Sequence, residues 1–352
     1  MPPANLKPTG SRVSWFWPWC AVLIAAAAVL TFRHLTLPAP KQAVATDVPF
    51  VRVLLGADLW TYFDSSLLDR TPRRFPAYSV DPVESRGMLE IAPKVQPDEL
   101  LVLVQAERFL SEEFLRQPGE PPGVHVAAGP FLRECSLALV MSKETRAQIL
   151  KTTPAPPNTL LVWLNACTAA SRPGQPITFY MADPNQCSAS WIGLSELVAE
   201  QMGNLDQKQL GAVADEQLSQ ALSEMGRQVT IQGVSDRLEL FKLLLGRYRP
   251  GAVLLTYDHL AAPLQQGYTG DYTFIVPEKH FHPVVQALLL TRIASLDTAR
   301  YLPTLLHSWS DCGLIQDAFR SQVPTPLAND ENRVPPYATM RRILEAWNSR
   351  SK

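Results

Sequence analysis

The stretch ITFYMADPNQCSASW, Ile177–Trp191, decides the fold, because it predicts a strand, a turn and the start of a helix in one run. Ile177–Met181 has the apolar and aromatic composition of a buried strand. Asp183-Pro184-Asn185 is typical of a turn, and the residues after it predict a helix over Ser190–Met202. Strands that alternate with helices in this way indicate an α/β sheet with parallel pairing.

The same alternation extends outward on both sides of this stretch. The predicted strands are Phe50–Leu55, Arg74–Val80, Leu100–Gln105, Cys135–Met141, Ile177–Met181, Val229–Gln232, Ala252–Thr256, Tyr272–Val276 and Val284–Leu290. The predicted helices are Asp58–Leu68, Pro82–Ile91, Ala106–Leu115, Lys143–Lys151, Ser190–Met202, Glu216–Met225, Asp236–Leu245, Asp297–Leu306, Gly313–Phe319 and a last helix after Pro336. The sequence therefore predicts an α/β protein.

An uncharged segment near the N-terminus predicts a membrane anchor. Val13–Phe32 contains no charged side chain, and Arg12 and Arg33 close its two ends. At 1.5 Å of rise per residue, a helix of this length covers roughly 30 Å, the thickness of a bilayer's hydrocarbon core. We expect residues 1–12 to be a cytoplasmic tail, 13–32 a transmembrane helix and 33–49 a linker.

Cleavage and orientation of the anchor rest on weaker signals. Ala43-Val44-Ala45 has the small-x-small form of a signal-peptidase site but lies about a dozen residues past the apolar segment, so a retained anchor is favoured. Lys7 and Arg12 precede the segment, and Arg33 and Lys41 follow it, which gives only a slight positive-inside bias. We expect the N-terminus in the cytoplasm and the large domain outside it.

Charge and motifs exclude several classes of function. Residues 1–45 carry four Lys or Arg and no acid, which leaves 28 basic and 33 acidic residues and a net charge of −5 for the remainder. Nucleic-acid binding calls for a basic patch and is not expected. The sequence contains no G-x-S-x-G, H-E-x-x-H, G-x-G-x-x-G or P-loop, so we expect no catalysis and no cofactor.

Several segments, taken in order, resemble the bacterial extracellular solute-binding proteins, which have the type II periplasmic-binding-protein fold. Val51–Gly56 resembles the first strand and loop of that family, and Phe179–Trp191 its strand, Asp-Pro and serine-bearing helix start. Gly251–Thr256 and Phe274–Pro283 resemble two later strands with their loops, and Ala318-Phe319-Arg320 a helix ending. The first loop departs from the family, because Gly56-Ala57-Asp58 stands where oxyanion binders have Gly-Ser.

The resemblance implies two lobes around a ligand cleft. Lobe 1 is expected to comprise residues 50–134 and 266–352, and lobe 2 residues 135–265, with two chain crossings as a hinge. Four cysteines follow the anchor and permit either two disulfides or free buried thiols. We predict the pairs Cys167–Cys187, within lobe 2, and Cys135–Cys312.

The candidate ligand-binding residues have ordinary structural explanations as well. Ser188 and Ser190 could bind an anion at a helix start or simply cap that helix. Asp183 and Asn185 could contact ligand or only form a turn. The remaining candidates follow predicted strands at the edge where open sheets bind ligands: Asp58, Trp60, Tyr257 and Asp258.

For these last residues the alternatives also stay open. Trp60 could stack on a ligand ring or belong to the core, and Asp258 could recognise a cationic group or be a solvated loop acid. His280 and His282 form an H-x-H pair, but no third ligand is evident and no metal site is predicted.

The sequence thus suggests a solute-binding-like domain tethered to a bacterial inner membrane, on its extracytoplasmic side. Such a domain would bind a small molecule or anion for transport or sensing, with a transporter or another membrane protein as partner. The alternative is an interaction or assembly protein that keeps the two-lobed scaffold without a ligand, which the missing Gly-Ser loop favours.

Overall fold

A computed structural model describes residues 50–62, 78–91, 94–105, 124–153, 155–262, 270–278, 281, 283–293 and 334–350. The predicted anchor 13–32, its linker up to residue 49 and the predicted helices 106–115, 297–306 and 313–319 lie outside these residues. Within the described ranges, no helix combines the length and the apolar character that a bilayer crossing needs. Residues Val48–Lys352 form a compact unit that holds the whole described core, so a fragment of these residues should fold alone.

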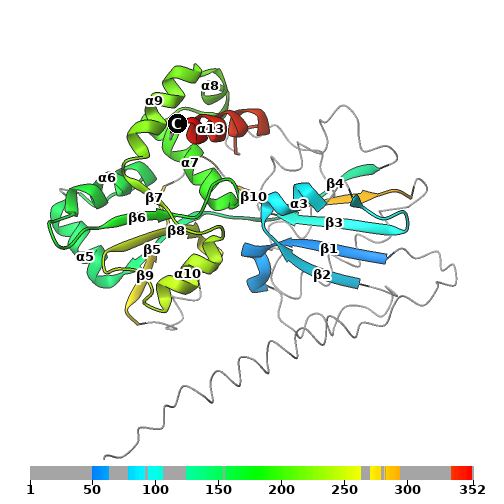
Figure 1. The fold of residues 1–352 in the computed structure, drawn as a ribbon, viewed down its shortest axis with the longest axis horizontal. Helices are drawn as coiled ribbons and strands as arrows, with labels where there is room; N and C mark the ends of the chain where they lie inside the picture. Colours follow the sequence, from blue (N-terminus) through cyan, green and yellow to red (C-terminus); the bar gives the residue numbers. More distant parts are fainter. Residues whose placement is uncertain are drawn as a thin grey trace, which may run out of the picture. The chain divides into compact units, whose positions relative to one another are not determined.

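The first sheet has five strands in the order β2-β1-β3-β10-β4 (Figure 1). Its strands are β1 (Phe50–Gly56), β2 (Tyr78–Val83), β3 (Glu99–Gln105), β4 (His125–Glu134) and β10 (Val284–Thr291). β1 pairs in parallel with β2 and β3, whereas β10 runs antiparallel to both β3 and β4. The late strand β10 therefore lies between two strands from the start of the domain.

The second sheet also has five strands, in the order β7-β6-β8-β5-β9. Its strands are β5 (Leu137–Ser142), β6 (Thr178–Met181), β7 (Val229–Ile231), β8 (Ala252–Tyr257) and β9 (Tyr272–Ile275). β6 is parallel to β7 and β8, and β5 is antiparallel to β8 and β9. The predicted α/β class and the alternation around Ile177–Trp191 are confirmed.

Helices cover the second sheet. They are α5 (Lys143–Thr152), α6 (Leu160–Ala170), α7 (Ser188–Gln201), α8 (Gln207–Ala212), α9 (Asp215–Met225), α10 (Asp236–Leu244) and α11 (Asp258–Ala261). α7 is buried on nearly every side, because it packs against β8, α6, α9 and the C-terminal helix α13 (Tyr337–Ser349). This helix is the centre of the helical layer.

Two elements after residue 266, the expected boundary between the lobes, lie with the second sheet and not with the first. β9 pairs with β5 and so extends the second sheet. α13 packs against α7 and α9, because its buried Met340, Ile343 and Trp347 join the core on that side. Of the described part of 266–352, β10 belongs to the first sheet, whereas β9 and α13 lie with the second.

Proline and glycine move several predicted boundaries. Pro82 lies inside β2, which runs to Val83, so helix α3 (Ser85–Ile91) begins three residues later than predicted. The chain after β1 forms the 3-10 helix η1 (Ala57–Tyr62) over the described part of the helix predicted for Asp58–Leu68. β4 was not predicted, because its Gly-Pro sequence reads as a break; the strand accommodates it where its pairing with β10 shifts register.

Candidate functional site

Ionisable residues follow the carboxyl ends of strands in both sheets. Asp58 follows β1, Glu84 follows β2, Asp236 follows β7, and Asp258 and His259 follow β8. Parallel strands bring the residues after them to one edge of a sheet, which is where open α/β sheets bind ligands. We call Asp58, Glu84, Asp236, Asp258 and His259 the acidic cluster.

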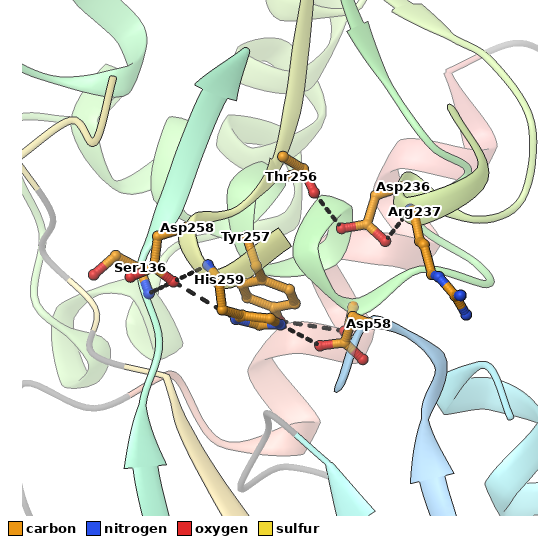
Figure 2. Close-up of polar contacts among 9 residues, drawn as sticks. Asp58, Ser136, Asp236, Arg237, Thr256, Tyr257, Asp258 and His259 are labelled. Carbon is orange, nitrogen blue, oxygen red and sulfur yellow. Dashed lines mark hydrogen bonds and ion pairs between the residues drawn. The ribbon is translucent and has the colours of Figure 1, made fainter. Parts of the chain in front are cut away.

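The pair Asp58–His259 joins the two halves of the acidic cluster. Asp58 lies in η1, beside the first sheet, and His259 lies in α11, beside the second. His259 Nε2 is 3.5 Å from Asp58 Oδ2, and both side chains are buried (Figure 2). When His259 is protonated, this contact between buried opposite charges bridges the two sheets. At 3.5 Å it is longer than a good hydrogen bond.

Asp258 fixes α11 to the chain crossing between β4 and β5. Ser136 N donates to Asp258 Oδ1 at 3.1 Å, and Asp258 N donates to Ser136 O at 2.8 Å. Asp258 Oδ1 also lies 3.6 Å from His259 Nδ1, so the imidazole has a carboxylate on each side. His259 is therefore held against the crossing as well as against Asp58.

Asp236 is the most deeply buried acid of the cluster. Thr256 Oγ1 donates to Asp236 Oδ2 at 2.8 Å, and the Arg237 N–H donates to Oδ1 at 2.8 Å (Figure 2). Burial, with the charge of Asp58 as the next cause, raises the pKa of Asp236 from 3.8 to about 6. Near neutral pH this carboxyl keeps part of its proton in the absence of a compensating cation.

Glu84 shows the same excess of negative charge. Burial and the charges of Asp236 and Asp58 raise the pKa of Glu84 to about 7, although a hydrogen bond with Ser235 opposes the change. The charge of Asp58 thus contributes to the raised pKa of both Glu84 and Asp236, and the charge of Asp236 contributes to that of Glu84.

In the other half of the acidic cluster, the pKa shifts of His259 and Asp258 favour the charged forms of both groups. Burial opposes protonation of His259, but interactions with Cys135, Asp258 and Asp58 hold its pKa well above the usual value. Burial alone would raise the pKa of Asp258, yet His259 and the Ser136 N–H lower it. Burial raises the pKa of the Cys135 thiol. An imidazolium between two carboxylates is the state that these contacts favour.

The structure brings five of the predicted site residues to this region, counting Asp258 of the acidic cluster. Asp58 belongs to the acidic cluster, and the Tyr257 ring stacks on His259 with centroids 5.2 Å apart. Tyr257 OH donates to Ser188 Oγ at 3.2 Å, and the buried Ser190 Oγ lies beside the Cys187 thiol with no other hydrogen-bond partner among the described residues. Neither serine is the cap of α7, because Cys187 occupies the N-cap position.

Two predicted site residues serve the turn and not the cluster. Asn185 N and Nδ2 both donate to Asp183 Oδ1, at 2.9 and 2.8 Å, which closes the turn before α7. Asn185 also exchanges hydrogen bonds with Asn348 of α13. The side chain of Trp60, and His280 and His282, lie outside the described part of the chain.

The predicted disulfide Cys167–Cys187 is wrong. Cys167 in α6 and Cys187 before α7 are free, and each is buried in the apolar core, where burial raises the thiol pKa. Cys135 is also a free buried thiol, whereas Cys312, its predicted partner, lies outside the described residues. The open alternative of buried thiols holds for these three positions.

The residues that the sequence interpretation missed share one signal. Glu84, Asp236 and His259 each come within about five residues of a strand end, as Asp58 and Asp258 do. A position after a strand end is the sequence signal they share, but it does not rank them above other polar residues of such loops. Among the described residues, no group of three or more His, Cys, Asp or Glu side chains could hold a metal ion.

No protein-family model and no curated protein matches this sequence. Among solved structures, iron-bound HitA from Pseudomonas aeruginosa matches with a TM-score of 0.50 and 12% identity, over 86% of this chain and 99% of that chain. The sulfate-binding protein SubI from Mycobacterium tuberculosis H37Rv matches at 0.49 and 11% identity, over 84% and 96%. The spermidine/putrescine substrate-binding protein PotD from Streptococcus pneumoniae matches at 0.48 and 10% identity, over 87% and 100%.

These identities establish a likeness of fold and nothing finer. The two-sheet architecture is similar to that of type II periplasmic solute-binding proteins, as the order of the sequence motifs predicted. The ligands named for the three neighbours belong to those proteins.

Proposed function

We propose that this chain is a solute-binding-like protein that takes a small organic cation at the acidic cluster. The observation that carries the proposal is the convergence of Asp58, Glu84 and Asp236, from the ends of strands in both sheets, with two raised carboxyl pKa values. His259 is the only base in the cluster, and the neighbouring Arg237 lowers the pKa of Glu84 only in part, as the last of its causes. An anion would add to the unfavourable charge, so the anion-binding interpretation of Ser188 and Ser190 is disfavoured.

A bound cation would take the place of protons. Glu84 near pH 7 and Asp236 near pH 6 are each about half protonated, because each is desolvated and faces other carboxylates. A positively charged amine placed among them would lower both pKa values and release protons to the solvent. Binding should therefore strengthen as the pH rises from about 5 to 8, as the competing protons leave.

The solute-binding fold suggests how the free energy of ligand binding would stabilise one arrangement of the two sheets. Contacts from η1 and α3 on one side, and α10 and α11 on the other, would favour the arrangement in which the two sheets are held together. With the anchor predicted at residues 13–32 retained, the domain would remain on the extracytoplasmic side of a bacterial inner membrane. It would pass its ligand, or the ligand-bound state, to a neighbouring membrane protein.

A thermal-shift and calorimetric comparison tests the proposal. The fragment 48–352 should melt at a higher temperature with diamines or quaternary amines than with sulfate or phosphate. Asp58→Asn should remove this response, whereas Glu216→Gln, at an exposed acid of α9, should keep it. Calorimetry in buffers of different ionisation enthalpy should show proton release. A fragment that responds to no cation, or equally in Asp58→Asn, would overturn cation binding.

The second candidate is an interaction or assembly protein without a ligand. The observation that favours it is the Asp58–His259 contact, which already joins the halves of the acidic cluster with the chain's own charges. The largest hydrophobic cluster also contains residues of both sheets, including Val53 and Leu139. Under this alternative, Asp58→Asn would destabilise the fragment, and no small cation would protect it.

Catalysis is a more distant possibility that Cys135 raises. Its thiol interacts with His259, which resembles a nucleophile beside a base. However, Cys135 is fully buried and its thiol pKa is raised, so it lacks the access and the thiolate character of a reactive cysteine. We propose that the pair is structural, and that native protein resists alkylation at Cys135.

A further inference from the structure

Helix α10 presents an apolar stripe to the solvent. Val234, just before the helix, and Leu238, Phe241 and Leu245 have exposed fractions of 52%, 47%, 59% and 57%. Their spacing of four, three and four residues places them on one face of a helix. The opposite face, with Leu240 and Leu243, is buried against β8. Single exposed apolar residues are ordinary, but two on one helix face, with Val234 before the helix and Leu245 at its C-cap, indicate a contact surface.

The charges around this stripe are almost all positive. Arg237, Arg247 and Arg249 are exposed, and Lys242 is partly exposed. The two acids of the same segment are turned inward: Asp236 and Glu239 are buried. Glu239 accepts hydrogen bonds from Lys242 Nζ at 2.6 Å and from Tyr248 OH at 2.5 Å. The segment 232–250 therefore shows the solvent only basic, apolar and uncharged side chains.

A pocket of about 240 Å³ adjoins the stripe and contains three of these basic residues. Lys242, Arg247 and Arg249 line it together with Tyr180 and Tyr248, whose rings meet edge to face at 4.7 Å. Lys242 and the Tyr248 hydroxyl already bond to Glu239, so the guanidinium groups of Arg247 and Arg249 are the donors that suit a phosphate group. An apolar stripe beside a phosphate-sized basic pocket has the two chemistries of a lipid, acyl chain and headgroup, side by side.

We propose that the α10 face docks on an anionic membrane surface, with a lipid phosphate in the basic pocket and the apolar stripe inserted between headgroups. Clusters of Lys and Arg beside exposed Phe and Leu are attracted to anionic lipid by charge and held by apolar burial. A second copy of the same face is disfavoured, because it would bring Arg237, Lys242, Arg247 and Arg249 against their own equivalents. The surface rests on these residues and does not depend on ligand binding at the acidic cluster.

Vesicle co-sedimentation of the fragment 48–352 tests this proposal apart from the anchor, which the fragment lacks. The fragment should sediment with vesicles of phosphatidylcholine mixed with phosphatidylglycerol and remain soluble with phosphatidylcholine alone. Arg247→Ser combined with Arg249→Ser should weaken binding about tenfold or more, and high salt should weaken it further. Phe241→Ser combined with Leu245→Ser should weaken binding at either salt concentration.

The matched control is Val162→Ser combined with Val276→Ser. It removes two apolar side chains from other parts of the chain, whose exposed fractions are 42% and 45%. This variant should sediment like the unchanged fragment, and all variants should show the same circular dichroism and melting temperature. Equal sedimentation of every variant, or no preference for anionic vesicles, would overturn the proposal. Binding of an acidic amphipathic peptide without binding to vesicles would overturn it in favour of a protein partner.

Discussion

At the scale of single residues, Asp236 links folding to pH. Its pKa is about 6 in the folded protein against 3.8 ordinarily, so the folded state holds the proton more tightly than the unfolded chain does. Its contribution to stability is therefore fully present below about pH 4 and is lost as the pH rises through 6. Glu84, with a folded pKa of about 7, acts in the same direction.

We expect Asp236→Asn to raise the free energy of unfolding near pH 8 by up to about 3 kcal/mol, because about two pKa units separate the folded and ordinary values. Near pH 4 the variant and the unchanged fragment should be equally stable, since both then carry an uncharged side chain. Urea unfolding of the fragment 48–352 across this pH range measures the difference. A variant that loses stability at pH 8 would show that the carboxylate is needed as a charge.

Gly251 makes a second residue-scale prediction, which concerns close packing. It has φ of +88°, and a Cβ there would lie 2.4 Å from Pro176 O. Gly174 has φ of +81° with nothing within 4 Å, so it shares the backbone requirement without the contact. Gly174→Ala should cost about 1 kcal/mol through left-handed strain, and Gly251→Ala at least about 1–2 kcal/mol more. Equal losses in denaturant unfolding would contradict the packing explanation.

The site was only partly predictable at this scale. Asp58 and Tyr257 were found because they follow strands, and Asp258 was noted as a possible partner for a cation. His259 and Asp236 could not be ranked from sequence, because their importance comes from contacts with residues far along the chain, such as Asp58 and Thr256. Asp183 and Asn185 form the turn before α7, which was the alternative left open for them, because turn chemistry and ligand chemistry use the same side chains.

At the scale of elements, α13 completes the helical layer over the second sheet. Trp191 Nε1 of α7 donates to Met340 O at 2.9 Å. Arg342 donates to Gly211 O at 2.9 Å, to Val213 O at 2.7 Å and to Asp215 Oδ1 at 2.6 Å. The guanidinium thus donates to carbonyl groups at the end of α8 and to the Asp215 carboxylate in the first turn of α9. These bonds connect α13 with α8 and α9.

The prediction for this element is that Ile343→Ala destabilises the fragment by about 2–4 kcal/mol, because the side chain is fully buried between helices. Arg341→Ala, at a position that is 61% exposed on the same helix, should cost less than about 0.5 kcal/mol. Thermal or urea unfolding measures both. Equal effects would mean that α13 contributes little to the stability of this domain.

Several elements with a clear local pattern were predicted well. Lys143–Lys151, Glu216–Met225 and Ala252–Thr256 agree with α5, α9 and β8 to within one residue at each end. α6 was missed, and the reason is physical. It is apolar without a clear polar face, and its first N–H groups are satisfied from α7, where Glu200 accepts from Leu160 N and Leu161 N. A cap supplied by a residue 40 positions away leaves no local trace.

At the scale of the whole molecule, the retained anchor is the prediction with the widest consequence. In bacterial cells the full chain should stay in the membrane fraction after an alkaline carbonate wash, and a chain that begins at residue 48 should not. N-terminal sequencing of the membrane-bound form should show that it begins at a residue before Ala45. A full chain found only in soluble fractions, with an N-terminus near Thr46, would mean that the segment is a cleaved signal peptide.

The two-sheet fold could be inferred because the order of strands, turns and helices is a property of the sequence. The assignment of segments to sheets is not, since the composition of β9 and β10 does not say which strands each pairs with: β9 pairs with β5, and β10 with β3 and β4. The placement of α13 with the second sheet likewise depends on complementary apolar surfaces that are distant in the chain.

The position of α13 also has a consequence for the order in which the protein can be made. Met340, Ile343 and Trp347 complete a core cluster that already includes Leu139 and Leu197. α13 follows α7 far along the chain, so the surface of α7 that these residues cover stays exposed until α13 has been synthesised. Contacts over such sequence distances form slowly, and uncovered apolar helices aggregate. We therefore expect this chain to depend on a chaperone until α13 has been made and has packed onto α7.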